Sequence, residues 1–120
     1  ECEHLKSGAT FITDAPIDNN GKGEAFSPTD TVATGLASCM ITMMGIKAGT
    51  LDVSIDGTTA LVTKTMAANP RRISRIDVEI VMPSKISEKS QKILENTANT
   101  CPVLYSLHPD IEKVIVFHWG

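Results

Sequence analysis

Residues 27–48, with the sequence SPTDTVATGLASCMITMMGIKA, form the stretch that decides the fold of this chain. Ser27 is a residue type that caps helix N-termini, and Pro28 suits the first helical position. Asp30 reproduces the acidic third residue of a capping box and places negative charge where the helix dipole favours it. Together these signals predict a helix over residues 28–48.

The predicted helix is apolar or small on nearly every face, and after Asp30 its only charged residue is Lys47. A helix that is apolar all round must be buried on all sides, and a 120-residue chain offers few ways to do that. Gly35 and Gly45 cost helix propensity but would let another helix or strand approach closely. We therefore expect a long buried central helix that needs a partner subunit.

The flanking sequence predicts a single α+β domain over residues 1–120. Before the helix, residues 4–13 read as a hairpin around Ser7 and Gly8, and residues 14–24 as a loop rich in turn formers. After the helix, the pattern predicts strands at 51–55, 58–66, 73–82 and 114–119, an amphipathic helix at 86–99 and a helical turn at 103–107. Asp56-Gly57 would join the first two strands, Pro83-Ser84 would end the third, and the continuously apolar last strand is expected to be central.

Composition and charge exclude several classes of partner. The chain is 42% hydrophobic and 21% charged with a net charge of −3, so it is expected to fold and to lack the basic stripe of a nucleic-acid-binding protein. Its basic cluster, Arg71, Arg72 and Arg75, reads as a solvated turn and strand edge. The most apolar run, residues 32–46, is broken by polar residues and glycines. From this we expect a soluble protein with no membrane span.

Three widely spaced cysteines, Cys2, Cys39 and Cys101, fit neither a disulfide framework nor a zinc site. The histidines are not spaced as metal ligands, and no phosphate-binding loop is present, so we expect no metal and no cofactor. Three methionines near Cys39 read as core filling. Such a cysteine count favours a reducing cytoplasm, where an isolated pair is more often catalytic or redox-sensing than structural.

Considered separately, Cys39 and Cys101 each allow two interpretations. Cys39 lies in an apolar helix, where it is either an inert core thiol or a nucleophile. Cys101 precedes Pro102, which suits the start of a helix, so unpaired N–H groups there would stabilise a thiolate. The other interpretation of Cys101 is a small residue that ends a loop, and Cys2 reads as incidental.

Taken together, the motifs resemble the OsmC/Ohr family. Phe26-Ser27-Pro28-Thr29-Asp30 followed by Gly35-Leu36-Ala37-Ser38-Cys39-Met40 is similar to the family helix that carries the reactive cysteine. Thr100-Cys101-Pro102-Val103 resembles the second-cysteine segment, and the S-P-T-D start resembles one subgroup. The resemblance spans nearly the whole chain.

This resemblance implies a swapped homodimer of α+β subunits with active sites at the subunit interface. It also implies a thiol peroxidase for organic hydroperoxides, in which Cys39 attacks the peroxide as a thiolate and becomes a sulfenic acid. Cys101 would resolve that sulfenic acid to a disulfide, and an external dithiol, often of lipoyl type in the family, would reset the pair.

The chain departs from the family pattern at two supporting positions. In the family's peroxidases an Arg and a Glu polarise the thiolate and the peroxide; Thr29 stands at the Glu position, with Asp30 adjacent. The Arg usually comes from an N-terminal strand, and the first arginine here is Arg71, either because the chain begins too late or because the subgroup lacks it. Arg71, Arg72 or Arg75 of a partner subunit would be a substitute. A non-enzymatic dimer that binds an apolar ligand or senses oxidation is the alternative function.

Overall fold

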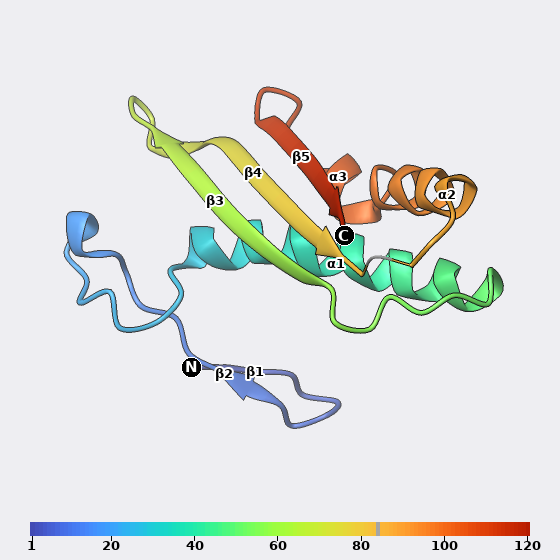
Figure 1. Ribbon diagram of the computed structural model, residues 1–120. Coiled ribbons are helices and arrows are strands. Elements are labelled where there is room, and N and C mark those ends of the chain that lie inside the picture. Colours follow the sequence, from blue (N-terminus) through green and yellow to red (C-terminus); the bar gives the residue numbers. More distant parts are fainter. Residues whose placement is uncertain (84) are drawn as a thin grey trace. The chain divides into compact units, whose positions relative to one another are not determined.

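The computed structural model describes residues 1–83 and 85–120, which form two compact units, Glu1–Val32 and Ala33–Gly120 (Figure 1). The expected end of a strand at Pro83-Ser84 therefore lies partly outside the described residues.

The first unit contains a small hairpin and a loop. Strands β1 (Cys2–Glu3) and β2 (Thr10–Phe11) pair antiparallel, with Cys2 opposite Phe11. Gly8 lies in the connecting turn with φ of 77°, a conformation that glycine adopts without steric cost. The hairpin predicted over residues 4–13 is thus confirmed, and the loop after it contains one 3-10 turn, η1 (Ile17–Asn19).

Helix α1 (Pro28–Thr50) begins where the sequence predicts and ends two residues later than expected. Its start is a capping box: the Asp30 backbone N–H donates to Ser27 Oγ at 3.0 Å, and the Ser27 N–H donates to Asp30 Oδ2 at 2.9 Å. The cap lies in the first unit, and the helix continues into the second.

Within one chain, burial of α1 is confined to one stripe of small and apolar residues: Ala33, Leu36, Ala37, Met40, Met44 and Ala48. The other side is open, and Ile46 there is 64% exposed. One chain alone therefore does not bury the helix on all sides, and the partner subunit expected from the sequence stays a prediction.

By length and composition alone, α1 is long and apolar enough to cross a membrane despite its polar interruptions. The core helix of a soluble protein meets the same criterion. The buried stripe of α1 belongs to one hydrophobic cluster with residues of the sheet and of the following helices, which is how a core helix packs.

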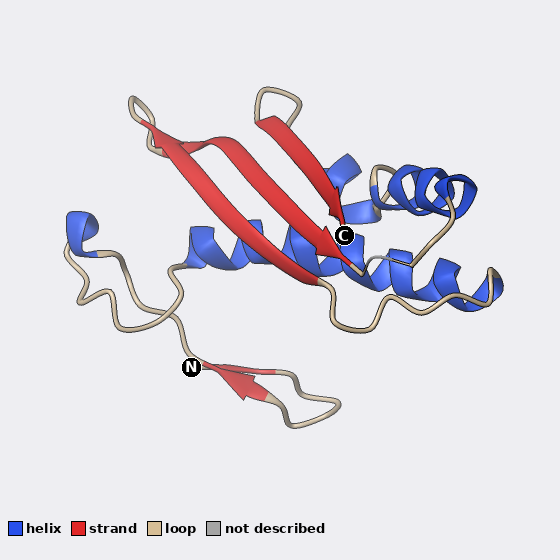
Figure 2. Ribbon diagram, viewed as in Figure 1, coloured by secondary structure: helices blue, strands red, loops and turns tan. Residues whose placement is uncertain are grey.

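A three-stranded sheet with the order β3-β4-β5 packs against α1 (Figure 2). Strands β3 (Thr59–Ala67) and β4 (Arg72–Met82) are antiparallel, whereas β4 and β5 (Glu112–Trp119) are parallel. Alternate residues of β4, namely Ile76, Val78, Ile80 and Met82, are buried in the cluster that includes α1. The sheet therefore has one core face and one open face.

Two strand predictions were wrong. Residues 51–55 form no strand, because Asp52 adopts φ of 56° and the Val53 N–H donates back to the carbonyl of Ala48 at the helix end. Leu51, Val53 and Ile55 still pack against the core, which explains their alternation. The last strand, β5, pairs only with β4 among the described residues, so it is an edge strand and not a central one.

Two short helices complete the second unit. Helix α2 (Glu88–Ala98) is capped by Ser87, whose side chain accepts the Ser90 N–H at 3.3 Å, and it buries Leu94 and Ala98. Helix α3 (Pro102–Ser106) follows after a short turn. Both agree with the sequence predictions, and the turn between them carries Cys101.

Candidate functional site

Cys101 is the N-cap of α3, and Pro102 is the first helical residue, as the sequence predicts. The side chain of Cys101 is fully buried, and its sulfur accepts the Leu104 backbone N–H at 3.4 Å. A cysteine in this place satisfies one of the N–H groups that a helix start leaves unpaired. The local sequence Cys-Pro thus fixes both the helix start and the direction of the thiol.

The pKa of the Cys101 thiol is raised above its ordinary value, chiefly because burial disfavours the charged thiolate. Hydrogen bonds from the backbone N–H groups of Leu104 and Val103 lower the pKa, but they do not outweigh the burial. The N–H groups at the start of α3 thus favour the thiolate of Cys101, as the sequence predicts, whereas burial favours its neutral form more strongly.

Cys39 lies in the middle of α1, and its half-buried side chain packs against the hydrophobic cluster. The proximity of the Cys39 thiol contributes further to the raised pKa of Cys101. Cys39 thus packs against the same hydrophobic cluster that contains Cys101, and both are free thiols here. The third cysteine, Cys2, is exposed on β1 in the first unit.

Unequal exposure distinguishes the two sulfurs. Cys39 is partly accessible to solvent, whereas Cys101 is 0% exposed. A molecule arriving from solvent therefore meets Cys39 first. An accessible thiol with a less accessible second thiol in the same cluster is compatible with an attacking and a resolving cysteine.

Thr29 and Asp30 form hydrogen bonds with Ser27 at the start of α1. The Thr29 hydroxyl lies 3.1 Å from Ser27 Oγ, and the Asp30 carboxylate accepts the Ser27 N–H. Both residues belong to the first unit. Their described contacts serve the helix cap, and their supporting role at the cysteines stays a prediction.

Arg71, Arg72 and Arg75 lie at the β3–β4 turn and on β4. The Arg72 guanidinium donates to the carbonyls of Ala68 and Pro70 in the turn at 2.9 and 2.8 Å. Arg71 is exposed in the same turn. Arg71 and Arg72 therefore lie in a solvated turn at the start of β4.

Arg75 forms a two-pronged ion pair with Asp77, with N···O distances of 2.9 and 2.8 Å, and reaches Glu112 at 3.3 Å. The hydrogen bond and the opposite charge raise the pKa of Arg75 and lower that of Asp77. In β4, residues 75 and 77 alternate with the buried Ile76 and Val78, so this pair lies on the open face of the sheet. Within its own chain, Arg75 faces away from the core that holds both cysteines.

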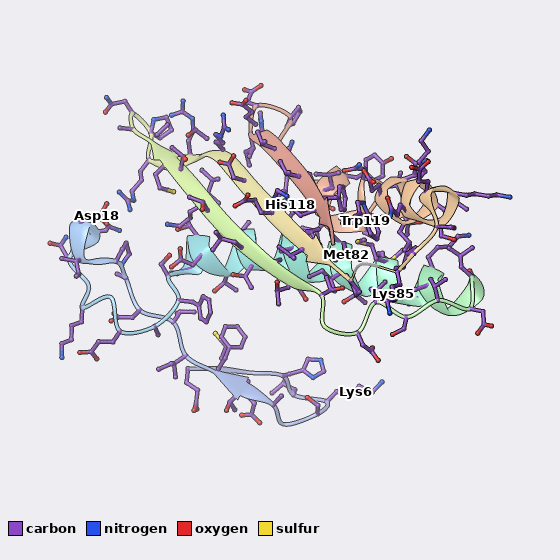
Figure 3. The ribbon with its side chains drawn as sticks, viewed as in Figure 1. Lys6, Asp18, Met82, Lys85, His118 and Trp119 are labelled. Carbon is purple, nitrogen blue, oxygen red and sulfur yellow. The ribbon has the colours of Figure 1, made fainter. Side chains whose placement is uncertain are left out.

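Sequence reasoning missed one hydrogen bond close to the Cys101 segment. The Trp119 indole N–H donates to the Glu95 carboxylate at 2.9 Å, joining the end of β5 to α2, the helix that leads to Cys101. Figure 3 shows Trp119 near the end of β5. Trp119 is the only tryptophan and is half-buried, so a partner for its N–H was to be expected. Nothing in the sequence singles out Glu95 as that partner, because the pairing depends on the tertiary fold.

The remaining polar features point to no second centre. Among residues 1–83 and 85–120, no group of His, Cys, Asp or Glu side chains is arranged to hold a metal ion. A shallow hollow of about 320 Å³ lies in the first unit, lined by residues 23–26 and Asp30. It contains no nucleophile.

Comparison with known proteins supplies the family context. The family model described as OsmC-like protein matches residues 21–114. A crystal structure of a protein from Psychrobacter arcticus 273-4, described as an osmotic stress induced and detoxification response protein, is 56% identical. The match covers 97% of this chain and 85% of that one, with a TM-score of 0.92. Among curated proteins, no significant match was found.

More distant structures share the fold. The organic hydroperoxide resistance protein OsmC of Legionella pneumophila is 16% identical with a TM-score of 0.71, covering 97% of this chain and 86% of that chain. An organic hydroperoxide resistance protein of Elizabethkingia anophelis is 15% identical with a TM-score of 0.75, covering 94% and 84%. At such identities the likeness concerns the fold alone.

Proposed function

The chain belongs to the OsmC-like protein family, and we propose that within it the chain is a thiol-dependent peroxidase that reduces organic hydroperoxides. The observation that carries this proposal is the packing of Cys39 against the buried cluster that contains Cys101, close enough for Cys39 to contribute to the raised pKa of Cys101. Two free thiols that are remote in sequence but close in the fold can be oxidised to a disulfide while a peroxide is reduced. The relatives described as organic hydroperoxide resistance proteins support a role in oxidative stress.

The proposed reaction has three balanced steps. The Cys39 thiolate attacks the terminal peroxide oxygen, the O–O bond breaks, and the alkoxide takes a proton to leave as an alcohol while Cys39 becomes a sulfenic acid. The Cys101 sulfur then attacks the sulfenic sulfur, giving a disulfide and water. An external dithiol donates two electrons and two protons, which restores both thiols and leaves the reductant as its own disulfide.

The different burial of the two cysteines supports the proposed division of roles. Cys39 is the partly exposed thiol, so it is the one a peroxide can reach. Cys101 is buried, and burial favours its protonated form, so it reacts less readily with peroxide than Cys39 does. Its proposed role is to attack the sulfenic acid formed on Cys39. We further propose a homodimer in the cytoplasm, with a lipoyl-type dithiol as the reductant.

A non-enzymatic role is the second candidate, and one observation favours it. Within its own chain Arg75 is paired with Asp77 on the open face of the sheet, and Thr29, a hydroxyl and not a carboxylate, stands at the position that the family resemblance gives to a Glu. A pair of this kind would still form a disulfide when oxidised. The protein would then bind an apolar ligand or sense oxidation, without turnover.

Peroxide consumption separates the two functions. The reduced protein is mixed with cumene hydroperoxide and excess dithiothreitol, and the remaining peroxide is followed with time. We expect catalytic loss of peroxide that falls to the background rate in Cys39→Ser and is unchanged in Cys2→Ser, the matched exposed cysteine. A wild-type rate equal to that of Cys39→Ser rules out the enzyme. Disulfide formation without turnover would support the sensor.

A further inference from the structure

Glu95 occupies a position in α2 where a carboxylate is unfavourable. It lies in the last turn of the helix, which contains no basic residue, and a helix C-terminus carries partial negative charge. The Trp119 indole N–H compensates by donating to this carboxylate at 2.9 Å, and a hydrogen bond to a charged acceptor is stronger than one between neutral groups. The bond joins the last residue of β5 to the end of α2 that leads to Cys101.

Backbone hydrogen bonds connect this end of α2 to the Cys101 turn. The Asn99 N–H donates to the Glu95 carbonyl at 3.0 Å. The Cys101 N–H donates to the carbonyl of Ala98, the last residue of α2, at 3.3 Å. The backbone of Cys101 is therefore attached to the last turn of the helix, and a shift of that turn would move Cys101 with it.

The hydrogen bond between Trp119 and Glu95 fixes α2 in a way that its apolar contacts do not. Burial of Leu94 and Ala98 packs the helix into the hydrophobic cluster, but apolar contacts have no preferred direction. Gln91, another polar side chain of α2, donates to a backbone carbonyl just before the helix at 2.9 Å and makes no tie to the sheet through that bond. A hydrogen bond is directional, so the one to Trp119 sets where the end of α2 lies beside β5.

We propose that Glu95 is a positioning residue of the redox pair: by accepting the Trp119 N–H, it holds the end of α2 where the Cys101 thiol can reach a sulfenic acid on Cys39. This deepens the proposed peroxidase function and rests on it. Disulfide formation tolerates little misplacement, because the two Cα atoms must come within about 4.4–6.8 Å of each other. Without the hydrogen bond, Cys101 would occupy a wider range of positions, so its attack on the sulfenic acid would be slower.

Variants that break or keep this hydrogen bond test the proposal. Trp119→Phe keeps an aromatic ring but removes the donor, Glu95→Ala removes the acceptor, and Glu95→Gln keeps an acceptor oxygen. Ser87→Ala is the matched control, because it removes the cap at the opposite end of the same helix. Urea unfolding gives the global stability of each variant.

The first measurement is the rate at which iodoacetamide modifies Cys101 under native conditions. All proteins carry Cys2→Ser and Cys39→Ser, so that Cys101 is the one remaining thiol. Because the Cys101 side chain is fully buried, its reaction requires a local opening of the turn that carries it. The modified fraction is followed with time by mass spectrometry.

We expect Trp119→Phe and Glu95→Ala to raise this rate about tenfold, the scale of one hydrogen bond to a charged group. The double variant should react no faster than either single variant, because both remove the same interaction. Glu95→Gln should stay close to the parent rate, and Ser87→Ala should match it even where its global stability is lower.

The second measurement follows the resolving step itself. Protein carrying only Cys2→Ser receives one equivalent of cumene hydroperoxide in the presence of dimedone, which traps a sulfenic acid that has not yet become a disulfide. Trp119→Phe and Glu95→Ala should shift the product from the disulfide to the dimedone adduct of Cys39. The rate at which Cys39 is oxidised should not change, a result that a general loss of stability would not give.

Unchanged modification of Cys101 in folded Trp119→Phe and Glu95→Ala overturns the proposal. An equal rise in Ser87→Ala also overturns it, because any loosening of α2 would then expose the thiol. If peroxide leaves Cys39 unoxidised in the parent while modification of Cys101 still follows the hydrogen bond, the peroxidase fails and the hold of Glu95 on Cys101 stands.

Discussion

At the scale of single residues, Cys101 combines two opposing effects on one sulfur. Backbone N–H groups at the start of α3 favour its thiolate, whereas complete burial disfavours it more strongly, and the result is a raised pKa. A raised pKa in the folded protein means that folding holds the proton on this thiol. The stability contributed is complete below the unfolded pKa and is lost as the pH rises through the folded one.

Stability should therefore fall on the alkaline side. In Cys101→Ala the free energy of unfolding should decline less steeply above pH 9.0, the ordinary pKa of the thiol, than in the parent protein. Urea unfolding under reducing conditions at several pH values measures this slope. Cys2→Ala is the control, and an identical slope in Cys101→Ala and the parent would show that burial does not shift the Cys101 pKa.

Substitution of Arg75 tests whether this arginine supports the reaction of the cysteines with peroxide. Its guanidinium binds Asp77 and Glu112 on the open face of the sheet, so Arg75→Gln should leave peroxide consumption unchanged. Loss of the exposed ion pair should cost little stability. The initial rate with cumene hydroperoxide is the measurement, and a large loss of rate in correctly folded Arg75→Gln would instead place this arginine at the partner's site.

At the scale of elements, the start of α1 depends on a reciprocal pair of hydrogen bonds between Ser27 and Asp30. Ser27→Ala removes one acceptor at a buried N-cap and should lower the free energy of unfolding by about 1 kcal/mol, within a range of roughly 0.5–2 kcal/mol. Chemical denaturation measures the change. Ser38→Ala, an exposed serine of the same helix, should cost nothing, and equal costs would contradict the capping role.

Local signals account for the elements that the sequence predicted correctly. The caps at Ser27 and Ser87, Pro102 after Cys101 and the turn at Gly8 each act over a few residues. Residues 51–55 were misread because their alternation comes from packing against the core, while the left-handed Asp52 prevents a strand.

At the scale of the whole molecule, the features that the sequence did not predict arise from contacts between residues that are far apart in the chain. The edge position of β5 and the Trp119–Glu95 hydrogen bond arise only from the tertiary fold, and no local pattern encodes them. The proposed pairing of Cys39 with Cys101 came from the resemblance to a family, because spacing alone left each cysteine open to an inert interpretation.

The proposed homodimer should depend on the open side of α1. Ile46 is 64% exposed there, an apolar residue that association would bury. Ile46→Lys should shift the protein toward monomer in light scattering, because an unpaired charge at an interface is costly. Leu61→Lys, at a residue 65% exposed on the open face of the sheet, is the control and should leave the assembly unchanged. If both variants became monomeric, or if neither did, the dimer contact would not lie on the open side of α1.

The most direct test of the central claim is a peptide map of the protein after treatment with one equivalent of cumene hydroperoxide. If Cys39 and Cys101 are a redox pair, the map will show one disulfide linking their two peptides, and Cys2 will remain a free thiol. If both thiols of the pair stay free, or if Cys2 is the bridged residue, the two sulfurs do not react with each other and the proposed chemistry is wrong.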